Sequence, residues 1–216
     1  MPVGASDSAF TAACDRNPSL KAYSFHVSVA MRMQTFPWMR FHLDGAGDYE
    51  RGERYEIQFT RVPFFAKDFT KVDLSALDPT MWEKQFFVQL VQEKDGMTTF
   101  ELRPRKIDPT EQNPLVVAQV MLDANHSTRD VVMQYSSGEI HMSLNPTETQ
   151  GFRLPESIDV DIKMPGRNLS AHADFTDYTI REIVAYRASR KATASKSSGS
   201  PREYRDRLSR PAGFRS

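Results

Sequence analysis

The sequence has a single cysteine, no long hydrophobic run and no leader-like start, and each absence excludes a class of protein. Cys14 has no second cysteine to pair with, which excludes an internal disulfide, and we expect it to be a thiol on a helix face. No stretch approaches the roughly 18 apolar residues that a membrane-spanning helix needs. The first ten residues lack the basic segment and apolar core of a secretion signal. We therefore expect a protein that does not span a membrane, and that either stays inside the cell or has lost a leader.

Motifs for catalysis and cofactor binding are also missing. The chain contains no glycine-rich phosphate loop, no Gly-x-Ser-x-Gly elbow and no cysteine pair. His172 and Asp174 lie two residues apart on an expected strand and share a face, but two ligands are too few for a metal or catalytic site, and we interpret them as part of a structural hydrogen-bond network. His26 and His42 fall on the polar side of their strands and should face solvent. We predict no catalytic residue, no metal, no cofactor and no enzymatic activity.

A formal net charge of zero hides two oppositely charged parts. From Arg187 to the end, nine basic residues stand against two acidic ones, which leaves residues 1–186 with 19 basic and 26 acidic groups. Residues 187–216 contain almost no apolar side chains, so they cannot bury enough surface to offset the entropy of ordering, and we predict a disordered basic tail there. A dedicated nucleic-acid binder should carry a basic folded face. The acidic body therefore argues against a nucleic-acid partner.

The clearest positive signal is a strict alternation of apolar and polar or small residues over Ala22–Met33. This period of two predicts one long half-buried β-strand. The same pattern recurs after a turn near Phe36 and again after Arg51-Gly52, so the first three strands should form an antiparallel meander. Gly45 and Gly47 share the parity of the apolar residues, which indicates a bend or a close backbone approach. A bulge at either glycine would exchange the two faces beyond it.

The remainder of the chain continues the strand pattern, with two interruptions. Residues 5–20 are expected to form a short helix, and the segment from Pro63 to Lys84 breaks the alternation and predicts one or two more. In total we expect about nine strands and at most three short helices. The first part of the second interruption, Pro63–Phe69, is either a lid or membrane-contact loop or an aromatic plug buried in the core.

Several short segments resemble a known family. They are Asn17-Pro18-Ser19-Leu20, Phe36-Pro37-Trp38, Leu43-Asp44-Gly45, Arg54-Tyr55-Glu56, Arg61-Val62-Pro63 and Ala171-His172-Ala173-Asp174-Phe175. Over roughly residues 17–180 the sequence resembles the LolA/LolB-like outer-membrane lipoprotein-sorting proteins. The resemblance implies a mainly β fold of the α+β type, a curved unclosed antiparallel β-barrel of about eleven strands plugged by short helices. It also implies an apolar cavity that holds acyl chains during transit across the periplasm.

Combined with this resemblance, the strand parity predicts a lipid-carrier half-barrel over residues 1–186 and a tail over 187–216. The expected partners are a lipid or the acyl chains of a lipoprotein, a transient envelope protein and a peripheral membrane contact, with the protein a monomer in the periplasm or cell envelope if a leader was removed. The expected lipid-binding residues are Tyr23, Phe25, Val27, Val29, Met31, Phe41, Leu43, Tyr55, Ile57, Phe59, Phe64, Phe65, Phe69 and Trp82. The alternative is a protein–protein interaction or scaffold module of the envelope with a filled β core, because alternation does not distinguish a filled core from a hollow one.

Overall fold

The computed structural model describes residues 3–36, 38–60, 62, 70–107 and 109–183. The chain divides into a unit Met1–Glu182 and a unit Ile183–Ser216, and all the elements below belong to the first. The predicted lid segment with Phe64, Phe65 and Phe69 lies outside the described residues, as does the predicted tail, so both stay predictions.

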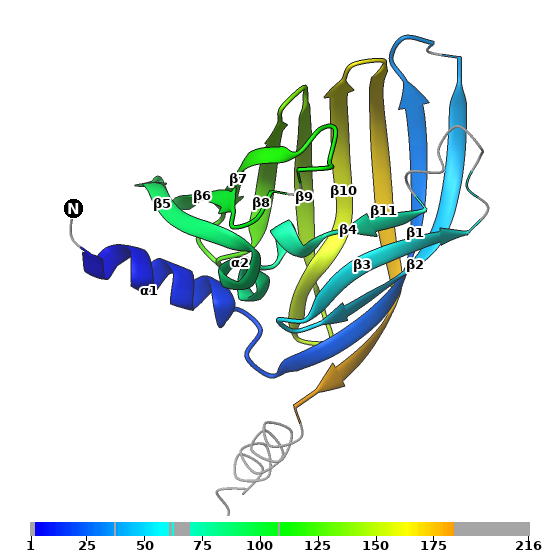
Figure 1. Ribbon diagram of the computed structural model, residues 1–216. Helices are drawn as coiled ribbons and strands as arrows, with labels where there is room; N and C mark the ends of the chain where they lie inside the picture. Colours follow the sequence, from blue (N-terminus) through cyan, green and yellow to red (C-terminus); the bar gives the residue numbers. More distant parts are fainter. Residues whose placement is uncertain (1–2, 37, 61, 63–69, 108, 184–216) are drawn as a thin grey trace, which may run out of the picture. The chain divides into compact units, whose positions relative to one another are not determined.

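One antiparallel sheet of eleven strands dominates the described residues (Figure 1). The strands are β1 Leu20–Met33, β2 Arg40–Glu50, β3 Arg54–Thr60, β4 Lys71–Asp73, β5 Phe86–Lys94, β6 Met97–Pro104, β7 Leu115–Leu122, β8 Thr128–Tyr135, β9 Glu139–Thr149, β10 Phe152–Met164 and β11 Arg167–Glu182. Their order in space is β4-β3-β2-β1-β11-β10-β9-β8-β7-β6-β5. Because β4 and β5 are the two edges and do not pair, the barrel is not closed. This confirms the predicted fold class.

Within the described residues, helical structure comprises α1 Val3–Cys14, the 3-10 turn η2 Ser75–Leu77 and α2 Pro79–Gln85. The last two confirm the helices expected before Lys84, and α2 lies on the concave side of the sheet (Figure 1). Asp78 caps α2 by accepting a hydrogen bond from the Thr80 amide at 3.1 Å, and Pro79 occupies the first turn, where a missing N–H costs nothing. No helix in the described ranges has the length and apolar character needed to cross a bilayer.

Two expectations about element boundaries were wrong. The first helix spans Val3–Cys14 rather than residues 5–20, because Arg51 donates hydrogen bonds to the Cys14 and Asn17 carbonyls and holds the chain as it leaves the helix. The number of strands was also expected to be about nine, whereas the described residues form eleven. The strand β4 has only three residues, which is too short for alternation to show.

The register from β1 to β3 is continuous, so the predicted inner face is preserved across the meander. No bulge occurs at Gly45 or Gly47. Instead, a Cβ on Gly47 would overlap the ring of Phe25, and one on Gly45 would lie 2.7 Å from the Gln58 carbonyl oxygen. The close backbone approach predicted for the two glycines is therefore confirmed.

Candidate ligand cavity

The inner face of the sheet is filled at one end and hollow at the other. At the filled end, rings from β1, β2, β3 and β11 pack together, with centroids of the Tyr23 and Tyr49 rings 4.6 Å apart and those of Phe25 and Phe175 5.2 Å apart. A second cluster joins Phe10 of α1 to Trp82 of α2 and Phe100 of β6. These two clusters form the packed part of the core.

The hollow end contains a cavity of about 470 Å³, which is far larger than a packing defect. Protein interiors hold few voids larger than a water molecule, and a single water needs only about 10–15 Å³ by the same measure. The volume falls within the range of about 300–1,000 Å³ that is typical of small-molecule sites.

Every strand except β6 contributes to the wall of this cavity, together with η2 and the end of α2. Twenty of the 25 lining residues are apolar. The lining residues are Val29, Met31, Leu43, Ile57, Phe59, Val72, Asp73, Leu74, Ser75, Ala76, Leu77, Gln85, Phe86, Glu111, Leu115, Met133, Tyr135, Ile140, Met142, Ile158, Val160, Ile162, Ala171, Ala173 and Phe175. Strands from both halves of the sheet contribute to the wall, so the cavity forms only when the chain folds.

Five of the residues predicted to bind lipid line this cavity. They are Val29, Met31, Leu43, Ile57 and Phe59. Of the others within the described residues, Phe25, Val27 and Trp82 are buried in the packed core, Phe41 packs against its edge, and Tyr23 and Tyr55 line a different pocket. Strand parity assigns all these residues to one inner face, but in the folded protein that face has a packed end and a hollow end.

More lining residues come from β7 to β11 than from the meander, and none of these was among the predicted lipid-binding residues. The alternation of Ile158, Val160 and Ile162 on β10 carried the same signal as that of β1. The missing information was which strands lie opposite one another across the hollow, since pairing order is not visible in local periodicity.

The few polar groups in the wall are largely satisfied by one another. Asp73 accepts a hydrogen bond from the Ser75 amide at 2.8 Å, and the Ser75 hydroxyl donates to Gln85 Oε1 at 2.7 Å. The Tyr135 hydroxyl donates to the sulfur of Met133 at 3.7 Å. Burial, together with the charge of Glu111, raises the pKa of Tyr135, so this phenol stays neutral. No lysine or arginine is among the described lining residues.

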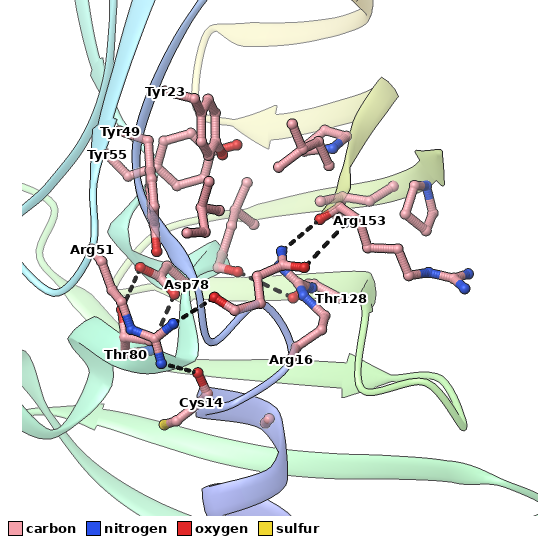
Figure 2. A pocket seen from close by; sticks show the side chains of 18 residues that line it. Cys14, Arg16, Tyr23, Tyr49, Arg51, Tyr55, Asp78, Thr80, Thr128 and Arg153 are labelled. Carbon is pink, nitrogen blue, oxygen red and sulfur yellow. Dashed lines mark hydrogen bonds between the residues drawn. The ribbon is translucent and has the colours of Figure 1, made fainter. Parts of the chain in front are cut away.

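A second, polar pocket of about 40 Å³ lies where α1 meets the opposite end of the sheet (Figure 2). Arg51 donates hydrogen bonds to the Asn17 carbonyl at 2.7 Å and to the Cys14 carbonyl at 2.6 Å. The Asn17 side chain in turn donates to the Arg153 carbonyl at 3.0 Å and accepts from the Arg153 amide at 3.2 Å. The pocket is too small for a hydrocarbon chain, and these bonds fasten the end of α1 and the segment after it to the turn between β2 and β3 and to β10.

Burial keeps the Cys14 thiol and the Tyr55 phenol of this pocket neutral. Burial raises the pKa of the Cys14 thiol to about 11, and the nearby Asp78 carboxylate adds to the effect. Burial also raises the pKa of Tyr55 to about 12. A protonated thiol is a poor nucleophile, which is consistent with the prediction that Cys14 is an ordinary helix residue.

Comparison with known proteins identifies the fold. No family model and no curated protein matches the sequence. Among solved structures, a LolA superfamily protein from Nitrosomonas europaea matches with a TM-score of 0.54 and 10% identity, over 82% of this chain and 94% of that chain. An outer membrane lipoprotein-sorting protein domain from Vibrio parahaemolyticus matches with a TM-score of 0.55 and 8% identity, over 81% and 91%. The chain has a LolA-like fold. A DUF1329 family protein from Desulfovibrio piger shares this fold, with a TM-score of 0.55 and 8% identity over 81% of this chain and 92% of that one.

The outer face of the LolA-like sheet carries His26, His42 and His172. His26 and His42 are exposed there, as predicted. His172 bonds through Nδ1 to Asp159 at 2.6 Å and through Nε2 to Asp174 at 3.3 Å, so the predicted hydrogen-bond network is confirmed. Within the described ranges, no three histidine, cysteine, aspartate or glutamate side chains are grouped so that they could hold a metal ion.

Proposed function

We propose that this protein is a non-catalytic carrier that holds a lipid, or the acyl chains of a lipoprotein, in the 470 Å³ apolar cavity. The single observation that carries the proposal is this cavity, which is lined by strands from both halves of an unclosed sheet. Two of the structural neighbours are a LolA superfamily protein and an outer membrane lipoprotein-sorting domain, which supports carriage across the periplasm as the setting.

The energetics suit such a carrier. Burying hydrocarbon contributes about 0.8 kcal/mol per methylene, so a chain of about a dozen carbons offers roughly 10 kcal/mol before the costs of ordering and association. Met31, Met133 and Met142 lie in the wall, and their flexible side chains adapt to cargo of variable shape. Binding therefore needs no charge pairing.

The polar lining defines the kind of head group that the cavity accepts. Glu111 and Asp73 are the charged groups in the described wall, and both are acidic. Both side chains are exposed, so an anionic head group that enters past them would meet like charge, which is unfavourable. We infer that the preferred cargo enters with an uncharged end, as esterified acyl chains do, rather than as a free fatty acid.

The test is a pair of alanine-to-phenylalanine variants on opposite faces of the sheet. Ala171 of β11 lines the cavity, whereas Ala30 of β1 is exposed on the outer face. Binding of a fluorescent acyl ester should be lost or weakened at least about tenfold in Ala171→Phe, since one ring occupies space that the chain needs. Ala30→Phe should bind like the wild type.

Two results would overturn the proposal. One is failure of the wild-type protein to take up the ester or to yield any lipid on native mass spectrometry after purification from a membrane-containing extract. The other is equal binding by both variants. The head-group inference is tested separately, by comparing a long-chain alcohol ester with the free acid, which should bind less tightly to the wild type.

The edge strand β5 supports a second candidate function, that of an envelope interaction module. Its outer edge pairs with no described strand, and it exposes Phe87 and Val91, whose exposed fractions are 57% and 53%. Such an edge can accept a strand from another protein. Stoichiometric capture of one envelope protein that persists in Ala171→Phe and is lost in a Val91→Pro variant would favour this function.

A further inference from the structure

The hairpin that joins β1 to β2 exposes an unusual group of large apolar side chains. Phe36, Trp38 and Met39 have exposed fractions of 44%, 77% and 36%. Three such residues within four positions form a patch, whereas isolated apolar residues on a surface are ordinary. The Phe36 and Trp38 rings contact each other edge to face, with centroids 5.6 Å apart.

Backbone hydrogen bonds hold this hairpin in shape. The Met39 amide donates to the Phe36 carbonyl at 2.8 Å, and the Met33 amide donates to the Met39 carbonyl at 3.2 Å. The Gln34 amide donates to the Asn168 carbonyl at 2.9 Å, which ties the hairpin to the start of β11. These bonds order the backbone at Met33, Gln34, Phe36 and Met39 before binding, which lowers the entropy cost of docking.

Two arginines lie on the strands at the base of this hairpin. Arg32 and Arg40 are register partners on β1 and β2, and both are exposed on the outer face. Like charges directly opposite one another destabilise a sheet. The strand on the other side of β1 places Ser170 next to Arg32, and neither arginine makes a salt bridge to a described residue. Both guanidinium groups are therefore available to an anion from outside the described fold.

We propose that this hairpin docks the protein on an anionic lipid bilayer. Trp38 and Phe36 enter the interfacial layer, where amphipathic rings are favoured, and Arg32 and Arg40 pair with lipid phosphates. Aromatic rings next to unpaired cations match that surface in both polarity and charge. The docking does not depend on cargo, and so goes beyond the carrier function.

The position of the hairpin relates docking to the cavity. Met31 of β1 and Leu43 of β2, which line the cavity, lie five residues before Phe36 and four residues after Met39. Docking through the tip would therefore bring the hollow end of the sheet, rather than the packed aromatic end, to the lipid surface.

Tryptophan fluorescence tests this proposal in the full chain. The sequence contains two tryptophans, Trp38, which is 77% exposed, and Trp82, which is fully buried. Vesicles of phosphatidylcholine mixed with phosphatidylglycerol should shift the emission to the blue, and phosphatidylcholine alone should do so far less. The shift should disappear in Trp38→Ser, and Arg32→Gln/Arg40→Gln should weaken binding by about tenfold or more.

Matched variants separate the hairpin from other surfaces. Phe87→Ser removes an exposed ring from β5, and Arg54→Gln/Arg181→Gln removes the same charge from other exposed positions. Both should retain the shift. Vesicle flotation that is equal in the wild type and Trp38→Ser would assign binding to the basic residues after 186 and overturn the proposal. The absence of any vesicle-dependent shift would overturn it too, and would leave ester binding in the cavity unaffected.

Discussion

Gly47 shows how one residue controls the packing of the aromatic end. The ring of Phe25 lies over the β2 backbone where a Cβ of residue 47 would otherwise stand. We predict that Gly47→Ala lowers the free energy of unfolding by about 1–3 kcal/mol through overpacking. Denaturant unfolding measures the loss. Phe25→Leu should recover part of it in the double variant, and strictly additive effects would contradict the proposed contact.

His172 makes a pH-dependent contribution to the stability of the folded protein. The hydrogen bond to Asp159 raises the pKa of His172 above its ordinary value, with the Asp159 and Asp174 charges adding to the effect. A raised folded-state pKa means that the contact stabilises the fold below the unfolded pKa of about 6.5, and that this stabilisation is lost as the pH rises through the folded-state pKa.

We therefore predict that wild type and His172→Gln differ more in stability near pH 6 than at pH 8. The pair is exposed, so the difference should stay within about 0.2–1 kcal/mol. Urea unfolding of both proteins across this range measures it. A difference that grows with increasing pH would contradict the assignment.

At the scale of elements, α2 depends on its amino-terminal cap. The Asp78 carboxylate accepts hydrogen bonds from the Thr80 amide and, at 2.6 Å, from the Thr80 hydroxyl, which itself accepts from the Gly52 amide at 3.1 Å. The cap therefore joins α2 to the turn between β2 and β3. The helix also carries Trp82, which packs against Phe10 and Phe100.

Removing this cap should destabilise α2 and its packing against the sheet. We expect Asp78→Ala to cost about 0.5–2 kcal/mol of stability and Asp78→Asn clearly less, since asparagine is also a good cap. Thermal or denaturant unfolding of the two variants provides the comparison. Equal losses would indicate that the charge of Asp78, rather than its capping bond, is what matters.

At the scale of the whole molecule, a hollow sheet should gain stability from its cargo. A ligand that binds only the folded state adds about 2.7 kcal/mol when its free concentration is a hundred times its Kd. We predict that a saturating acyl ester raises the melting temperature of the wild type and of Ala30→Phe, and leaves Ala171→Phe unchanged. A shift of equal size in all three proteins would indicate surface adsorption.

The sequence by itself determined the local parts of this protein. Alternation in β1, β2 and β3 predicted those strands and their inner face, and Arg51-Gly52 predicted the turn, where Gly52 has a φ of +68°. These features depend on a period of two and on backbone angles that glycine alone adopts easily, so neighbouring residues suffice to define them. The three-residue β4 was missed because its pairing with β3 is not a local property.

Only the tertiary structure decided which part of the inner face is hollow. Tyr23 and Met31 share a parity on β1, yet Tyr23 is covered by Tyr49 and Tyr178, while Met31 borders the cavity. The difference arises because β1 pairs with β11, almost at the other end of the chain, and β11 supplies large rings at one end and the small Ala171 and Ala173 at the other. Periodicity records the side to which a residue points, and packing across the sheet determines what it meets there.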